Sequence, residues 1–244
     1  MKQTSTQIII LAAGKGSRMN SEIPKVLHET NGKSLIHYVL STSYSLNPNN
    51  IMIVVGFKSE MVKKAVSDDK IFFVEQKKQL GTGHAVMQCQ RYINSESEIL
   101  ILYGDVPFIT QSTLSKLILE HKKNDNDASI LSSIVPNSRG YGRILRDESG
   151  NFLHIREEKD ANNYEKEINE INTGICVFKG SILKKYISKI NNNNNQNEFY
   201  LTDIFSLLLN SGNKIGVSEL INYEEAIGIN TQDELLEASI QNNK

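Results

Sequence analysis

The segment Leu11-Ala12-Ala13-Gly14-Lys15-Gly16-Ser17-Arg18-Met19 combines small residues with two cations. Glycines allow a tight turn whose N–H groups point outward, and small side chains let a ligand approach the backbone. Such a loop binds phosphate groups. It is not a Walker A loop, because no Gly-Lys-Ser/Thr ends the required spacing, and Met19 stands where a dinucleotide fingerprint needs its third glycine. An ordinary turn with solvated Lys15 and Arg18 remains an equal alternative.

Another cation, Lys25, follows Pro24 closely behind this loop. Held near the loop, its ammonium group would neutralise a phosphate as a point charge. Read in isolation, a surface lysine is the simpler interpretation.

A carboxylate, Asp105, comes directly after the apolar run 99–102, in Tyr103-Gly104-Asp105-Val106-Pro107. Magnesium takes oxygen ligands, often one or two carboxylates together with substrate phosphates. Asp105 is therefore a candidate Mg²⁺ ligand. A helix cap is the alternative, although the following Val106-Pro107 disfavours an immediate helix.

Gln76 and Gly81-Thr82 follow the apolar run 71–74. A glutamine amide both donates and accepts hydrogen bonds, so it can read the edge of a nucleobase. Gly81 would permit close approach, and Thr82 would contact the base or cap the next helix. A polar loop with a helix cap is the alternative interpretation.

Short apolar, β-branched runs alternate with amphipathic stretches along the first half of the chain. We predict strands at 8–11, 51–55, 71–74, 99–102 and 128–135, and helices from 34, from 59, at 82–92 and at 112–122. Continuous apolar strands separated by helices indicate a mostly parallel sheet covered on both faces. Ligands bind such sheets beyond the carboxyl ends of the strands, which is where all the segments above lie.

The second half is less regular. We predict a strand pair within 140–155, a strand at 174–178, a solvated Asn/Gln loop at 191–197, a helix capped by Thr202, and a last helix near Thr231. The fold class is thus α/β, a Rossmann-like, mostly parallel sheet with helices on both faces and an inserted β region. We expect one domain over residues 1–244.

Composition narrows the function class. The 244 residues carry a formal net charge of -1, with 39% hydrophobic and 23% charged residues, typical of a globular protein. Balanced charge gives no footprint for nucleic acid, and no apolar run approaches the about 20 residues that span a bilayer. We therefore expect neither nucleic acid nor a membrane as a partner. Two cysteines, Cys89 and Cys176, lie in apolar stretches, which predicts buried, reduced thiols in a cytoplasmic protein.

The motifs together resemble those of the sugar-phosphate nucleotidyltransferases, and specifically the uridylyltransferase domain of bacterial N-acetylglucosamine-1-phosphate uridylyltransferases. The resemblance covers residues 8 to about 230. Its motifs, in order, are Leu11-Ala12-Ala13-Gly14-Lys15-Gly16-Ser17-Arg18-Met19, Pro24-Lys25-Val26-Leu27, Gln76, Gly81-Thr82-Gly83-His84-Ala85, Tyr103-Gly104-Asp105-Val106-Pro107, Gly140-Tyr141-Gly142-Arg143-Ile144, Glu157-Glu158-Lys159-Asp160-Ala161, Glu170-Ile171-Asn172-Thr173-Gly174 and Glu198-Phe199-Tyr200-Leu201-Thr202-Asp203.

The resemblance implies a role for each site residue and a glycosyltransferase-A-like nucleotidyltransferase fold. Arg18 and Lys25 would be catalytic. Asp105 would bind Mg²⁺ with Asn230, which the sequence alone presents as a helix cap. The substrate-binding residues that it implies are Leu11, Ala12, Ala13, Gly14, Gln76, Gly81, Thr82, Tyr103, Gly104, Gly140, Glu157 and Asn172. Gln76, Gly81, Thr82 and residues 12–14 would hold the uracil, while Gly140, Glu157 and Asn172 would bind the sugar, with Tyr103 lining the same cleft.

The implied reaction joins UTP to N-acetylglucosamine 1-phosphate and releases pyrophosphate. Two alternatives stay open: the same chemistry on another sugar 1-phosphate such as glucose 1-phosphate, and a non-catalytic sugar-nucleotide sensor. Relatives usually continue into an acetyltransferase domain of hexapeptide repeats, and this sequence contains no such repeat. We therefore expect no acetyl transfer, and a monomer or weak oligomer without the trimerising domain. The sequence fits both a natural single-domain enzyme and a fragment.

Overall fold

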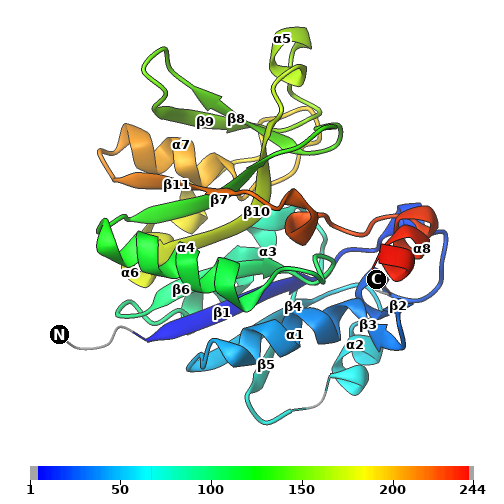
Figure 1. Ribbon diagram of the computed structural model, residues 1–244. Helices are drawn as coiled ribbons and strands as arrows, with labels where there is room; N and C mark the ends of the chain where they lie inside the picture. Colours follow the sequence, from blue (N-terminus) through cyan, green and yellow to red (C-terminus); the bar gives the residue numbers. More distant parts are fainter. Residues whose placement is uncertain (1–4, 67, 242–244) are drawn as a thin grey trace.

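The computed structural model describes residues 5–66 and 68–241. A central sheet of nine strands runs through these residues, with β11-β7-β10-β6-β1-β4-β5 as its main order (Figure 1). The bounds are β1 Thr6–Ala12, β4 Asn50–Val55, β5 Ile71–Glu75, β6 Glu98–Tyr103, β7 Ala128–Ile134, β10 Glu170–Lys179 and β11 Ile215–Leu220. Only β10 runs antiparallel to its neighbours on this path, so the predicted mostly parallel sheet is confirmed.

Alternate residues of the strands face two separate hydrophobic layers, because side chains point to opposite faces of a sheet. Ile9 and Leu11 pack in one layer with α3, α6 and α7, whereas Ile8 and Ile10 pack in the other with α1, α2 and α4. Figure 1 shows helices on both faces. Their bounds are α1 Leu35–Ser45, α2 Ser59–Ala65, α3 Thr82–Cys89, α4 Gln111–Lys123, α6 Gly180–Tyr186 and α7 Asp203–Asn210.

The inserted β region is a hairpin of β8 (Gly142–Arg146) and β9 (Phe152–Arg156), with α5 (Asn163–Lys166) following it. Strand β8 joins the sheet by pairing with β10, where Gly142 lies opposite Asn172. Figure 1 places this region at one end of the molecule, opposite α2 and β5. The hairpin thus projects one wall beyond the parallel part of the sheet.

A second small hairpin, β2 (Glu29–Thr30) with β3 (Lys33–Ser34), packs beside the last helix, α8 (Gln232–Gln241). The hydroxyl groups of Thr30 and Ser239 lie 2.8 Å apart and join the two. The β2–β3 hairpin and the last helix therefore meet on one side of the molecule (Figure 1).

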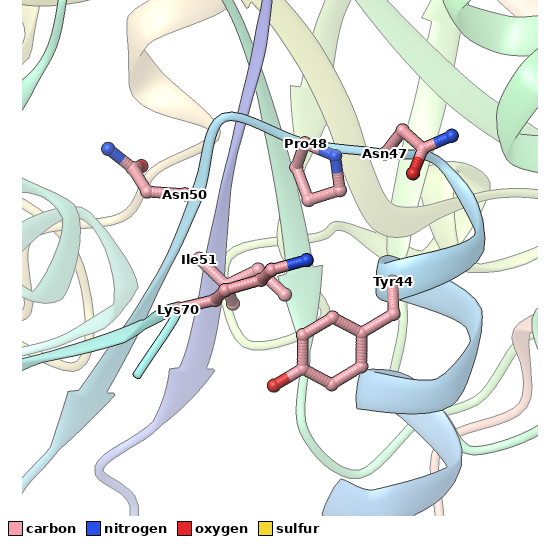
Figure 2. A pocket seen from close by; sticks show the side chains of 6 residues that line it. All are labelled: Tyr44, Asn47, Pro48, Asn50, Ile51 and Lys70. Carbon is pink, nitrogen blue, oxygen red and sulfur yellow. The ribbon is translucent and has the colours of Figure 1, made fainter. Parts of the chain in front are cut away.

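The two ends of the sheet differ in what they enclose. The carboxyl ends of β1, β5 and β6 open onto a cleft of about 600 Å³, which is in the size range of ligand pockets. At the amino end of β4 there is only a hollow of about 70 Å³, too small for a metabolite. Figure 2 shows that hollow, bounded by Tyr44, Asn47, Pro48, Asn50, Ile51 and Lys70.

Two further predictions are tested by the structure. Cys89 and Cys176 are buried and free, as predicted, and burial raises the pKa of Cys89 to about 12, which makes it a poor nucleophile. The predicted capping role of Thr202 is wrong: this residue precedes α7, but its hydroxyl donates to Glu157 instead of capping the helix. No helix in the described part of the chain is long and apolar enough to cross a bilayer.

Candidate active site

The cleft at the carboxyl end of the sheet gathers the predicted site residues from both halves of the chain. Those that line it are Leu11, Ala12, Ala13, Gly14, Arg18, Lys25, Gln76, Gly81, Thr82, Tyr103, Asp105, Gly140, Glu157, Asn172 and Asn230. Strands β1 and β6 lie side by side at its base, with Leu11 opposite Tyr103. The chain continues from β1 toward β4 on one side and returns to β6 on the other, so the cleft sits at a topological switch point.

Gly104 is the one predicted residue that does not line the cleft. Its N–H donates to the Leu11 carbonyl at 2.9 Å. A Cβ at this position would stand 2.9 Å from Val26 Cγ1, closer than side chains tolerate. The glycine therefore lets the segment after Lys25 pack against β6, and its predicted contact with substrate stays a prediction.

Four polar side chains meet in the middle of the cleft. Lys25 Nζ forms an ion pair with Asp105 and donates to Asn230 Oδ1 at 2.9 Å. Arg18 Nη2 donates to the same Asn230 oxygen at 2.9 Å. Gly16 has φ +63°, and a Cβ there would stand 2.6 Å from Lys25 Cβ, so glycine is required both for the turn and for the lysine stem.

Asn230 reaches this cluster through its neighbour. The Ile229 N–H donates to the Asp105 carbonyl at 2.8 Å, and the Ile229 side chain is 2% exposed. The helix-cap interpretation of Asn230 is wrong as far as its side chain is concerned. Thr231 fills that role, since its hydroxyl accepts from the Glu234 N–H at 3.2 Å while Glu234 accepts from the Thr231 N–H. The Asn230 side-chain oxygen is thereby left for the cleft, while its NH₂ group donates to the Gly228 carbonyl at 3.0 Å.

The Asp105 and Asn230 oxygens converge on one cationic group, the Lys25 ammonium. A carboxylate and an amide oxygen are hard ligands of the kind that Mg²⁺ prefers. Among the described residues, no group of three or more His, Cys, Asp and Glu side chains could hold a metal ion. Magnesium usually keeps waters and substrate phosphates as its other ligands, so this two-oxygen set fits it.

Gln76 defines one side of the cleft and is 3% exposed. Its Nε2 donates to the Gly81 carbonyl at 3.0 Å and lies 3.0 Å from His84 Nδ1. Burial lowers the pKa of His84, which favours a neutral ring that can accept at Nδ1. In the tautomer that accepts at Nδ1, both amide hydrogens are engaged within the protein, and the Gln76 oxygen is then the group that can accept from a ligand.

Gly81 lines the cleft and also has a packing role, and its predicted contact with a ligand stays a prediction. Its φ of +107° suits only glycine, and a Cβ would stand 2.6 Å from the Phe199 carbonyl oxygen. That carbonyl accepts from the Gly83 N–H at 2.8 Å. The start of α3 is thus joined to the segment around Phe199, and Thr82 takes part by accepting from the Leu201 N–H at 3.1 Å.

The opposite side of the cleft carries Glu157, Asn172 and Tyr103. Burial raises the pKa of Glu157, and Asp203 raises it further, although the Thr202 hydroxyl donates to Glu157 Oε1 at 2.7 Å. Asn172 Oδ1 accepts from the Gly174 N–H at 3.1 Å, so the NH₂ group of Asn172 is available to donate. This side therefore offers both acceptors and donors to a polar ligand.

The similarity to known proteins agrees with this arrangement. Residues 8–141 match the MobA-like NTP transferase domain family. This chain belongs to that family. It is therefore a nucleotidyltransferase.

Curated relatives match over nearly the whole chain. The chain is 47% identical to the bifunctional protein GlmU of Francisella philomiragia over 231 residues, which is 95% of this chain and 50% of that protein. It is 42% identical to the GlmU of Clostridioides difficile over 94% of this chain and 50% of that protein. The chain thus spans about half the length of the relatives that it matches.

A solved structure has the same fold. The Bacillus anthracis protein assigned as a glucose-1-phosphate thymidylyltransferase, in complex with sucrose, aligns with a TM-score of 0.79. The alignment covers 97% of this chain and 95% of that one at 20% identity. This comparison supports the nucleotidyltransferase fold and no finer conclusion.

Several cleft residues of this nucleotidyltransferase were not predicted as site residues. Among them are Lys15, Gln79, Tyr141, Gln196, Glu198 and Tyr200. Gln196 comes from the run predicted to be a solvated loop, yet its Nε2 donates to the Tyr200 hydroxyl at 2.8 Å. Glu198 and Tyr200 stand within a recognised motif, which was the signal available for them. For Gln196 the sequence offers no signal beyond its proximity to that motif.

Proposed function

We propose that this chain transfers UMP from UTP to N-acetyl-α-D-glucosamine 1-phosphate, giving UDP-N-acetylglucosamine and pyrophosphate. The observation that carries the proposal is the convergence of Arg18, Lys25, Asp105 and Asn230 between two chemically different walls. The 42–47% identity to the GlmU proteins over 94–95% of the chain supports the choice of substrates.

In the proposed reaction, a phosphate oxygen of the sugar 1-phosphate attacks the α-phosphorus of UTP in line. One O–P bond forms, the bond between the α-phosphorus and its bridging oxygen to the β-phosphorus breaks, and pyrophosphate leaves. No covalent enzyme intermediate is required. The chief obstacle is electrostatic, because two anions meet while charge develops on the leaving group. Positioning and charge neutralisation then supply most of the catalysis.

The two cations of the cluster have separate tasks in this proposal. Arg18 is exposed at the end of the glycine loop, and its planar guanidinium would stabilise the triphosphate as charge moves to pyrophosphate. Lys25 is largely buried, with 16% of its side chain exposed, so its ammonium acts in a weakly screened position. It would neutralise the phosphates that bring the two substrates together.

Asp105 and Asn230 would hold Mg²⁺ in this proposal. The ion, when bound, supplies positive charge that lowers the repulsion between the two phosphorylated substrates. The chain itself positions both ligand oxygens through the Ile229 N–H bond to the Asp105 carbonyl. It also keeps a lysine beside the carboxylate, which balances the charge of Asp105 in the unliganded cleft.

Base and sugar selection follow from the two walls. The Gln76 oxygen would accept from the N3–H of uracil, whereas cytosine has an acceptor at N3 and would meet an acceptor. Across the cleft, the Asn172 NH₂ would donate to the N-acetyl carbonyl, and Glu157 would bind sugar hydroxyl groups.

We further propose that the chain forms a single domain and acts in the cytoplasm as a monomer or weak oligomer. One continuous sheet supports the single domain, and two unpaired, buried cysteines support the cytoplasmic location.

Pyrophosphate release tests the proposal directly. Purified protein is supplied with UTP, Mg²⁺ and either N-acetylglucosamine 1-phosphate or glucose 1-phosphate, with CTP replacing UTP in a parallel set. We expect rapid release only with UTP and the N-acetyl sugar. A preference for glucose 1-phosphate would retain the mechanism and reject the sugar assignment. Absence of release with every sugar phosphate and triphosphate would reject catalysis in favour of a sugar-nucleotide sensor.

A further inference from the structure

Arg143, on β8, is among the largest fully buried side chains of the described chain, with 2% of it exposed. A buried charge is costly unless it is paired and hydrogen-bonded. Its guanidinium forms an ion pair with Glu158 at 2.8 Å and donates to the Tyr141 carbonyl. It also reaches the Lys166 carbonyl at 3.4 Å. One side chain thus links the segment before β8, the segment after β9 and the end of α5.

Glu158 extends this link to the backbone of the cleft. Burial raises the pKa of Glu158, but hydrogen bonding to the Gly140 N–H and the charge of Arg143 together bring it below its ordinary value. In addition, Arg143 ties the Glu158 carboxylate to the Tyr141 carbonyl, and Tyr141 is the chain neighbour of Gly140. Gly140 itself faces open space, since no protein atom lies within 4 Å of the position that a Cβ would occupy.

The pair joins two residues that the proposed function assigns to the sugar. Gly140 lines the cleft from the segment before β8, and Glu157 lines it from the segment after β9. Glu157 is the chain neighbour of Glu158, so a displacement of one backbone moves the other. Neither Arg143 nor Glu158 lines the cleft itself. Their influence on a ligand must pass through Gly140 and Glu157.

We propose that Arg143 and Glu158 are a positioning pair that fixes the spacing between the Gly140 backbone and the Glu157 carboxylate, and thereby sets the affinity for the sugar 1-phosphate without affecting UTP. This inference rests on the proposed function, because it needs the sugar 1-phosphate to occupy that wall. A hydrophobic pair of similar volume would stabilise the fold at least as well in many proteins, so an ion pair with a fully buried arginine points to orientation as its role here.

The same strand provides a matched control. Arg146 also forms an ion pair, with its Nε and Nη2 at 2.7 and 2.6 Å from the carboxylate of Glu170. This pair ties β8 to β10, is 34% exposed at the arginine, and lies outside the cleft lining. Loss of Arg146 therefore reports what an ion pair between β8 and β10 contributes when neither partner is a chain neighbour of Gly140 or Glu157.

The test compares Arg143→Met, Arg143→Lys, Glu158→Gln and Arg146→Met in pyrophosphate release, with melting temperature measured alongside. We expect Arg143→Met to raise KM for N-acetylglucosamine 1-phosphate by about tenfold or more, because small misplacements of binding groups have large effects. KM for UTP should stay within about twofold. Arg143→Lys keeps the charge without the fork, and Glu158→Gln keeps an acceptor for Gly140, so both should show smaller rises in the same KM. Arg146→Met should change neither KM.

The outcomes separate positioning from stability. An unchanged sugar KM in Arg143→Met, a parallel rise of both KM values with a lower melting temperature, or an equal sugar effect in Arg146→Met would each overturn the inference. If Arg143→Met does not fold, Arg143→Lys and Glu158→Gln carry the same comparison against Arg146→Met. A wild-type protein that turns over no sugar phosphate defeats the proposed function and this inference with it. If the wild type is active and the variants have unaltered KM values, this inference fails while the proposed function stands.

Discussion

The two walls of the cleft are built in different ways. The wall with Gln76 and the glycine loop comes from short segments that each follow a parallel strand, namely β1, β5 and β6. The wall with Gly140, Glu157 and Asn172 comes from the β8–β9 hairpin and the antiparallel β10. We call these the nucleotide wall and the sugar wall. The first is fixed by the sheet itself, and the second depends on side chains that hold an added hairpin in place.

This difference appears in the electrostatics of the sugar wall. Burial raises the pKa of Glu157, and burial with the Asp160 charge raises that of Asp203 to about 6. Arg143 is buried in the same region. Polar groups kept in such environments cost stability, and proteins retain them where function requires them. The sugar wall is therefore the place where we expect function and stability to oppose each other.

The largest expected effect lies between the walls, at the proposed metal site. Asp105→Ala should abolish Mg²⁺-dependent turnover, lowering kcat by at least about 10³-fold, because both substrates depend on charge neutralisation there. Pyrophosphate release across a Mg²⁺ titration measures this. Asp69→Ala, which removes an exposed acid, is the matched control and should behave as wild type. Substantial turnover of the Asp105 variant at ordinary Mg²⁺ would place the metal site elsewhere.

The next effect belongs to the nucleotide wall. Arg18→Ala should lower kcat by about 10²–10³-fold, or roughly 3–4 kcal/mol of barrier, with little change in either KM, because the guanidinium acts on charge that develops in the transition state. Arg18→Lys keeps the charge without the planar fork, so its kcat should lie between those of the wild type and Arg18→Ala. The kcat of each variant is measured by steady-state kinetics at saturating substrate concentrations. A normal kcat in Arg18→Ala would remove this residue from the catalytic assignment.

The nucleotide wall was largely predictable from sequence. Leu11, Gln76 and Asp105 each come just after a strand or close to its end, and the carboxyl ends of parallel strands meet at one edge. The structural reasons for the glycines were harder to predict from the sequence. Gly81 and Gly104 are predicted ligand contacts, and the structure adds a second reason for each glycine, the close approach of Phe199 and Val26. Such close approaches involve residues far apart in the chain, which local patterns do not record.

The rest of the site depends on tertiary contacts that no local pattern contains. Asn230 reaches the cleft only because the Ile229 N–H bonds to the Asp105 carbonyl. Arg143 stands within a recognised motif, but no local pattern marks it as buried, and its burial follows from the pairing of β8 with β9 and β10. Without the resemblance to known nucleotidyltransferases, the sequence would have predicted the nucleotide wall and the sheet, but neither of these residues.

A smaller effect should separate the two walls. Glu157→Gln should raise KM for the sugar 1-phosphate by about tenfold, the effect of one lost charge-assisted hydrogen bond, while KM for UTP stays unchanged. Gln76→Ala should do the reverse, raising KM for UTP alone. The pair of variants is measured in one pyrophosphate assay with each substrate varied in turn. If either variant raised both KM values equally, the walls would not be independent and the comparison would fail.

The smallest expected effect is on stability. Asp203, in the first turn of α7, has a folded-state pKa of about 6, above the ordinary value of 3.8. An acid whose pKa rises on folding binds more protons in the native state, so stability falls as pH rises from about 4 to about 6. Asp203→Asn removes this pH-dependent loss of stability. It also removes a charge that raises the pKa of Glu157.

The melting temperature of Asp203→Asn relative to wild type should therefore increase between pH 4 and pH 7. After screening by solvent at this partly exposed site, the gain is about 1 kcal/mol, or roughly 2–4 °C for a chain of this size. Asp233→Asn, another first-turn acid on α8, is the control and should show no such pH-dependent gain. A difference between Asp203→Asn and wild type that stayed constant with pH would mean that the sugar wall holds its carboxylates at no cost to stability, and the contrast between the two walls would then be one of geometry alone.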